Sequence, residues 1–149
     1  MSTARGGGYR VATLVAGLLL VLTGCSQHAA TLDDLTHALT EAHSALGASI
    51  LALDQLDRGR STRAVAQTAL QDMSKQVSDA QHMIDPIKIG SDAEQVDRDA
   101  TSTALAGAAT ATLNARDTLA LHDRSVNRDQ LMAADAAVTS LLVRLRESG

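Results

Sequence analysis

The stretch TLDDLTHALTEAHSALGASILALDQLD, residues 31–57, decides the fold of this chain. Its small and apolar residues recur at alternating spacings of three and four, which keeps them on one face of an α-helix. They are Leu32, Leu35, Leu39, Ala42, Leu46, Ser49, Leu53 and Leu56. Thr31 followed by Asp33 and Asp34 is typical of a helix start, and Gly59 is typical of a helix end. The stretch therefore predicts one long helix with a single apolar face.

The same three- and four-residue spacing of apolar side chains continues in two further segments. Ser61 or Thr62 can cap a second helix, which Asp85 and Pro86 then end. Its apolar face consists of Ala66, Leu70, Met73, Val77, Ala80 and Ile84. Asn127 is the predicted cap of a last helix. The apolar face of that helix consists of Leu131, Ala134, Val138, Leu141 and Leu145.

Another helix is predicted between these two segments. Ser91 and Glu94 have the spacing of a capping box, and the helical pattern runs from there to about Leu121. Residues 104–111 are nearly all alanine, glycine and threonine. Such residues favour the close approach of a neighbouring backbone but leave little apolar area to bury.

These patterns define the expected fold class. No segment shows the alternation of a β-strand, and the connections between the helices are short. We therefore predict an all-α chain in which residues 31–149 form an antiparallel up-and-down four-helix bundle. A long helical hairpin that completes its core by oligomerising is the alternative, because the small residues of the third helix suit both arrangements.

The residues before this domain have the composition of an export signal. Arg5 and Arg10 precede an uncharged apolar run, Val11–Leu22, and small residues follow it. The run is 12 residues long, whereas a helix needs roughly 20 apolar residues to span a bilayer. A removed signal peptide is therefore the preferred interpretation over a permanent membrane span.

The end of this run carries a recognisable motif. Leu22-Thr23-Gly24-Cys25 resembles the lipobox of bacterial lipoproteins. The resemblance implies that a signal peptidase recognises Leu22, Thr23 and Gly24, removes residues 1–24, and leaves Cys25 as a lipid-bearing first residue. Residues 25–30 would then be an acylated tether at the outer face of the cell membrane. The alternative is a secreted protein whose only cysteine is a free thiol, which is uncommon in an oxidising compartment.

Composition narrows the range of ligands. Loss of Arg5 and Arg10 with the leader moves the formal charge from −4 to −6, so nucleic acid is not an expected partner. Tyr9, in the leader, is the only aromatic residue, which argues against carbohydrate, nucleotide and cofactor binding. We therefore expect no cofactor. The excess of alanine, aspartate and arginine over lysine suggests the high-GC genome of an actinobacterium.

Catalytic and metal-binding patterns are weak. The chain contains no Glu-x-x-His motif and no Gly-x-Ser-x-Gly turn. Two helix-spaced pairs, His37 with Glu41 and His82 with Asp85, could hold a metal. A solvated helix surface is the preferred interpretation of both, so we expect no enzymatic activity.

A group of arginines is the one candidate binding site outside the lipobox. In an up-and-down bundle, two connections lie together at the end far from the membrane. That end would carry Arg58, Arg60, Arg63, Arg124 and Arg128. Five guanidinium groups could hold an anionic partner, such as a phosphate-bearing wall polymer or an acidic protein patch. The alternative is local pairing with Asp54, Asp57, Asp123 and Asp129.

Three functions follow from these observations. The preferred one is a membrane-anchored, non-catalytic helical module that binds an unknown envelope protein or polymer. The second is a carrier or sensor of an apolar small molecule or lipid, whose pocket would be lined by Leu46, Leu70, Leu105 and Leu141. The third, a hydrolase or metalloenzyme, would require His37 or His82 beside two further carboxylates in a closed pocket.

Overall fold

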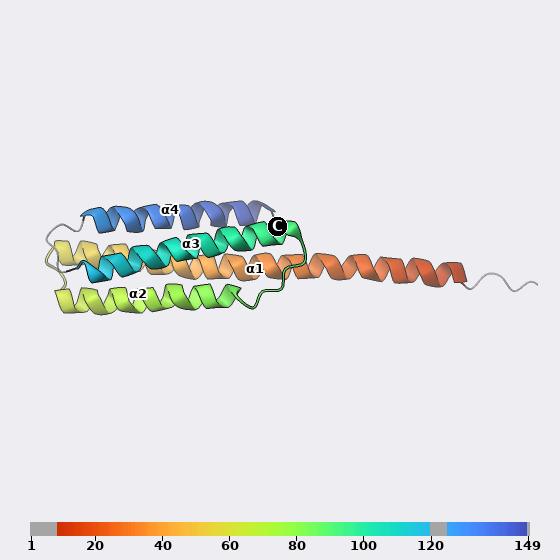
Figure 1. Ribbon diagram of the computed structural model, residues 1–149, viewed down its shortest axis with the longest axis horizontal. Helices are drawn as coiled ribbons and strands as arrows, with labels where there is room; N and C mark the ends of the chain where they lie inside the picture. The colour runs from red at the N-terminus through yellow and green to blue at the C-terminus, as the bar shows by residue number, and fades with distance from the viewer. Residues whose placement is uncertain (1–8, 120–124, 149) are drawn as a thin grey trace, which may run out of the picture.

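The computed structural model describes residues 9–119 and 125–148, and it describes side chains from His28 onward within those ranges. Four helices and no strand occur there: α1 (Tyr9–Asp57), α2 (Arg63–Ile84), α3 (Asp92–Asp117) and α4 (Ser125–Ser148). They lie side by side, and α1 extends beyond the other three at its N-terminal end (Figure 1). The all-helical bundle expected from the sequence is therefore confirmed.

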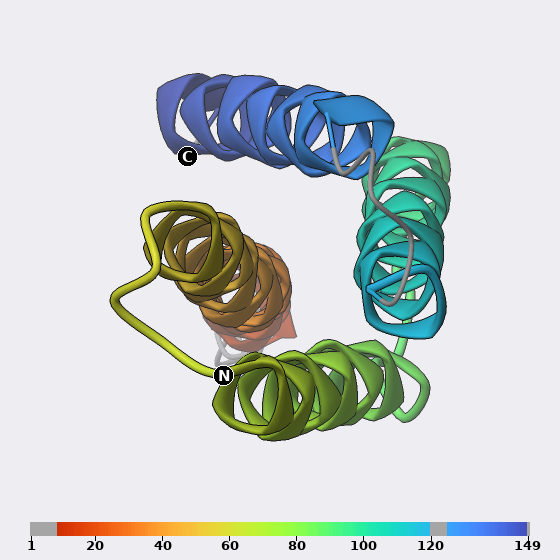
Figure 2. The ribbon, with the colours of Figure 1, turned by 90° about the vertical axis from the view of Figure 1, so that its left-hand side faces the viewer.

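The helices surround a common core. α1 packs against α2 and α4, and α3 packs against the same two helices. A smaller contact joins α1 to α3, while α2 and α4 lie on opposite sides of the bundle (Figure 2). The bundle thus closes its core within a single chain.

The predicted apolar faces form that core. On α1, every predicted residue from Leu32 to Leu53 is buried, and Leu56 is partly buried. On α3 the buried side chains are small, and Leu105 is the only leucine among those within the helix. Thr101 and Thr112 are fully buried there, and their hydroxyl groups donate to the carbonyl oxygens of Asp97 and Ala108 at 2.8 and 2.9 Å. The core is therefore rich in leucine on α1 and thin on α3.

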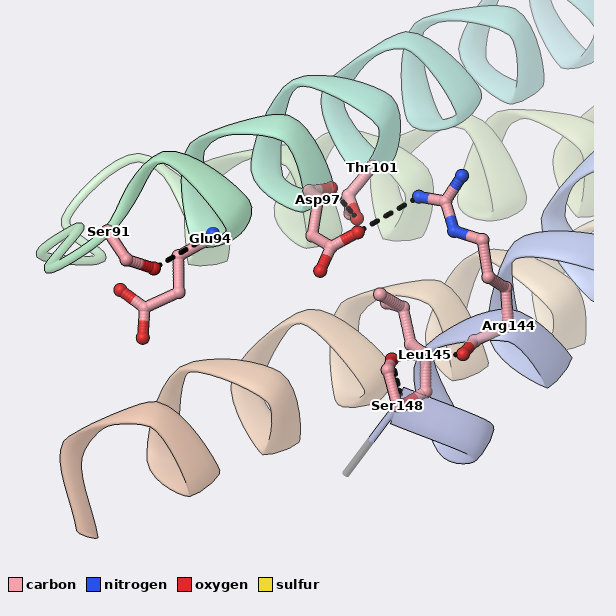
Figure 3. A network of polar contacts seen from close by, with 7 residues as sticks. All are labelled: Ser91, Glu94, Asp97, Thr101, Arg144, Leu145 and Ser148. Carbon is pink, nitrogen blue, oxygen red and sulfur yellow. Dashed lines mark hydrogen bonds and ion pairs between the residues drawn. The ribbon is translucent and has the colours of Figure 1, made fainter. Parts of the chain in front are cut away.

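Several predicted helix boundaries are confirmed. Thr62 caps α2, because its hydroxyl oxygen accepts from the Val65 backbone N–H at 3.3 Å. Ser91 caps α3 by accepting from the Glu94 N–H at 3.2 Å (Figure 3). α1 ends before Gly59, whose φ of 65° is the left-handed conformation that glycine adopts without a Cβ penalty.

Three predicted boundaries are wrong. α1 does not begin at Thr31, because residues 28–30 already belong to it and Thr31 is buried. Residues 25–30, the predicted tether, belong to α1. α3 ends at Asp117, before Leu121. Asn127 is not a cap but lies inside α4, where its buried side-chain amide donates to the Thr118 hydroxyl at 2.6 Å.

Within the described residues, no helix is both long enough and apolar enough to cross a bilayer.

Candidate interaction surface

A shallow groove runs along the outer side of α3 and α4. It consists of two adjoining concavities of about 480 and 520 Å³ that share Gly107 and Ala134. The first is lined by Ala100, Thr103, Ala104, Gly107, Ala134, Ala137, Ser140, Leu141 and Arg144. The second is lined by Ala106, Gly107, Thr110, Ala111, Asn114, Gln130, Ala133 and Ala134. We call this surface the α3–α4 groove.

The groove is almost free of charge. No charged side chain occurs between residues 100 and 115 of α3, and Asp135 of α4 instead contacts His43 of α1. The hydroxyl groups of Thr103 and Thr110 donate to carbonyl oxygens of their own helix, both at 2.9 Å. Because this satisfies their polar atoms, these threonines contribute an apolar methyl group to the surface.

Polar contacts close the groove at both ends. Arg144 reaches from α4 to α3, where one of its guanidinium N–H groups donates to Asp97 Oδ1 at 3.0 Å (Figure 3). At the other end, the Asn114 amide donates to Gln130 Oε1 at 3.4 Å. These contacts hold α3 and α4 together while the surface between them stays open.

Exposed apolar side chains are concentrated on the same two helices. Five of the eight large ones that the structure describes belong to α3 or α4. They are Val96, Leu113, Val126, Met132 and Val143, which are 39–63% exposed. A largely uncharged groove on two helices that also expose large apolar side chains is typical of a surface that a partner covers.

Local carboxylates partly neutralise the predicted group of five arginines, which we call the arginine tip. Arg58 pairs with Asp54 at 3.1 Å, and Arg128 of α4 pairs with Asp57 of α1 at 2.5 Å. Arg60 and Arg63 are exposed and form no ion pair with any residue that the structure describes. Arg124 lies outside the described residues. Two of the five arginines thus follow the alternative of local pairing.

The structure describes no side chain of the lipobox, which consists of Leu22, Thr23, Gly24 and Cys25.

Three histidines contact carboxylates through Nδ1. The distance from this atom to the carboxylate oxygen is 2.9 Å for His28 and Glu94, 2.6 Å for His43 and Asp135, and 3.4 Å for His82 and Asp85. Thr139 is also near His43, but its hydroxyl lies 3.5 Å from the same Nδ1 atom. A catalytic relay needs the hydroxyl and the carboxylate on different ring nitrogens, so this trio lacks that geometry.

Of these contacts, the one at Glu94 is buried. The carboxylate is 3% exposed and accepts from the Gly90 backbone N–H at 2.6 Å as well as contacting His28. The Gly90 hydrogen bond, and after it the His28 hydrogen bond, hold the pKa of Glu94 below its ordinary value of 4.5. Glu94 thus fastens the connection before α3 to His28 of α1.

The pairs considered as metal ligands do not form a shared site. Glu41 accepts from the Gln76 amide at 2.6 Å rather than pairing with His37. Within residues 9–119 and 125–148, no three histidine, cysteine, aspartate or glutamate side chains gather closely enough to hold an ion. The leucines predicted to line a carrier pocket are buried in the core, and of these only Leu141 also lines the groove.

Comparison with known proteins adds no assignment. No family model, curated protein or solved structure matches this chain.

The sequence already indicated part of this surface, because residues 104–111 predicted the close approach of another backbone. It did not show that the small residues of α4 lie beside those of α3. The signal that would have extended the prediction is the charge-free run from Ala100 to Ala115.

Proposed function

We propose that this chain is a bacterial lipoprotein, held at the outer face of the cell membrane by lipid on Cys25, whose α3–α4 groove binds one apolar α-helix of another envelope protein. The observation that carries the binding role is the open groove between α3 and α4, in which the charged lining residue Arg144 is paired with Asp97. The lipobox resemblance of Leu22-Thr23-Gly24-Cys25 supports the anchor.

The bundle in this proposal has antiparallel up-and-down topology. Figure 1 supports this arrangement, because the connection between α2 and α3 lies on the side from which α1 emerges. Cys25 lies three residues before His28 in α1, and His28 contacts Glu94 near the start of α3. The lipid would therefore be one helical turn from the packed bundle, which would stand directly on the bilayer.

A helix is the occupant that best fits the groove. The charge-free run of α3 covers sixteen residues, or about 24 Å at 1.5 Å per residue. Alanine, glycine and threonine form most of the surface between the two ends of the groove, and such small residues suit close helix packing at about 8–10 Å between axes. A sugar or a nucleotide usually stacks on an aromatic side chain, and none lines the groove.

The anchor is tested by mass spectrometry of the protein extracted from its own membranes. The expected mass is that of residues 25–149 plus acyl chains, and Cys25→Ser should abolish both processing and membrane retention. A wild-type product without acyl chains would refute the anchor while leaving the groove untouched. A recurrent bound small molecule would instead favour the carrier function.

The groove is tested by site-specific photo-crosslinking in living cells. A photoreactive residue at Ala137, which is exposed in the groove, should give one discrete protein adduct. The matched control is Gln71, which is exposed on α2. Ala137→Arg should abolish the partner's co-purification, and Gln71→Arg should not. Equal adducts at both positions would refute the groove as the binding surface, and an adduct with a second copy would replace the proposed partner by self-association.

A further inference from the structure

A second pocket, of about 250 Å³, lies between α1 and the end of α2, away from the α3–α4 groove. Asp34 and His37 of α1 line one side. Met83 at the end of α2, followed by Pro86 and Ile87, lines the other. The pocket therefore brings the thioether of Met83 to the same place as an imidazole and a carboxylate of α1.

The packing of α1 on α2 accounts for this meeting. The Gln76 amide bonds to Glu41 at 2.6 Å and fixes how the two helices lie against each other. His37 is about one turn from this bond along α1, and Met83 is two turns from it along α2. Both side chains line the same pocket, and the three rotatable bonds of methionine leave its thioether free to adjust toward the imidazole.

His37 differs from the other histidines that the structure describes. His28, His43 and His82 each have Nδ1 on a carboxylate. His37 has no such contact within the described residues, so its ring nitrogens are available to a ligand. Met83 is 37% exposed, so its thioether is accessible to a ligand.

We propose that His37 and Met83 form a binding site for the soft cation Cu(I). Imidazole and thioether are ligands that suit copper, and thioether sulfur selects Cu(I) over Mg²⁺, Ca²⁺ or Mn²⁺. Pro86 and Ile87 supply an apolar wall beside the donors, and the Asp34 carboxylate supplies compensating negative charge. The inference is independent of the lipid anchor and of the α3–α4 groove.

This donor pair was not visible in the sequence. A metal-ligand pattern within one helix has spacings of three or four, whereas His37 and Met83 come from different helices. The thioether also falls outside the usual set of histidine, cysteine and carboxylate ligands.

The test is a titration of the full-length chain with Cu(I) against the chelator bicinchoninate. The chain carries Cys25→Ser, so that a free thiol does not contribute. We expect one Cu(I) per chain, and at least a ten-fold loss of affinity in His37→Ala and in Met83→Leu. Both replacements are at exposed positions, and thermal melts followed by circular dichroism verify that the variants are folded.

Two matched controls distinguish this site from nonspecific binding. His82→Ala removes the neighbouring histidine, which contacts Asp85, and Met132→Leu removes an exposed methionine of α4. Both should keep the affinity of the parent chain. Failure of the parent chain to compete with the chelator, an equal loss in the controls, or equal affinity for Mn²⁺ would overturn the proposal.

Discussion

Gly107 lies in the middle of α3, exposed to solvent, and no atom stands within 4 Å of the place where a Cβ would be. Glycine inside a helix is about 0.8–1.0 kcal/mol less favourable than alanine. Because the added methyl group meets nothing, Gly107→Ala should raise the free energy of unfolding by about that amount. For a domain of this size the melting temperature should rise by about 3–6 °C.

The same substitution should act in the opposite direction on binding. Gly107 lines both concavities of the α3–α4 groove, so a methyl group there occupies space that the partner helix would use. Overpacking of a close contact costs about 1–3 kcal/mol, and partner affinity should therefore fall by about 5- to 150-fold. Urea denaturation followed by far-UV circular dichroism measures stability, and co-purification of the crosslinked partner measures binding.

Gly47→Ala is the matched control. Gly47 is exposed on α1, has the same open space where a Cβ would be, and does not line the groove. It should give the same gain in stability with no change in binding. A loss of stability in Gly107→Ala would refute the helix-propensity argument, and equal binding by both variants would refute the role of the groove.

Two further changes test the ends of the helices. Gly59→Ala should lower the free energy of unfolding by about 1 kcal/mol, because the φ of 65° forces an L-residue into the left-handed region; Gly59→Asn should lower it less, and an unchanged urea midpoint for alanine would contradict the reasoning. Glu94 has a pKa below 4.5 in the folded chain, so its carboxylate stabilises the fold above that pH, and this contribution is lost as the pH falls through the folded-state value. In Glu94→Gln, the contribution of this carboxylate to the fall in unfolding free energy below about pH 4.5 should disappear. A urea midpoint that falls with pH as steeply as in the parent chain would count against this role of Glu94.

Much of the fold could be predicted from the sequence because helix faces and caps are local properties. The leucines at three- and four-residue spacing on α1 are buried as predicted, and the side chains of Thr62 and Ser91 cap their helices. The errors occur where a tertiary contact overrides a local signal. Thr31 has the sequence of a helix start, yet the helix already includes His28, which contacts Glu94 sixty-six residues away.

The candidate sites were less predictable, because they depend on how helices pack. The small residues of α3 indicated a close approach, but only the packing of α4 beside them forms a groove with defined ends at Arg144 and Asn114. The arginine tip shows the same limit. Pairing of Arg128 with Asp57 joins residues of different helices, and sequence alone left it as an alternative to an anionic site.

The buried hydroxyl groups have a mechanical consequence. Ser49, Thr101 and Thr112 each donate to a carbonyl oxygen of their own helix, at 2.8–2.9 Å. None of these three bonds crosses between helices, so axial slip of one helix along another would leave them intact. Such slip would instead be resisted by the interlocking leucines of the core and by contacts between helices, such as the bond between Gln76 and Glu41.

In the proposed lipid-anchored state, a pull on α1 along its axis would act first on the His28–Glu94 contact, which is the described side-chain contact nearest in sequence to Cys25. That contact joins α1 to α3, and the Arg144–Asp97 contact joins α3 to α4 in turn. The two contacts would thus pass the load from the proposed anchor to the two helices that line the α3–α4 groove.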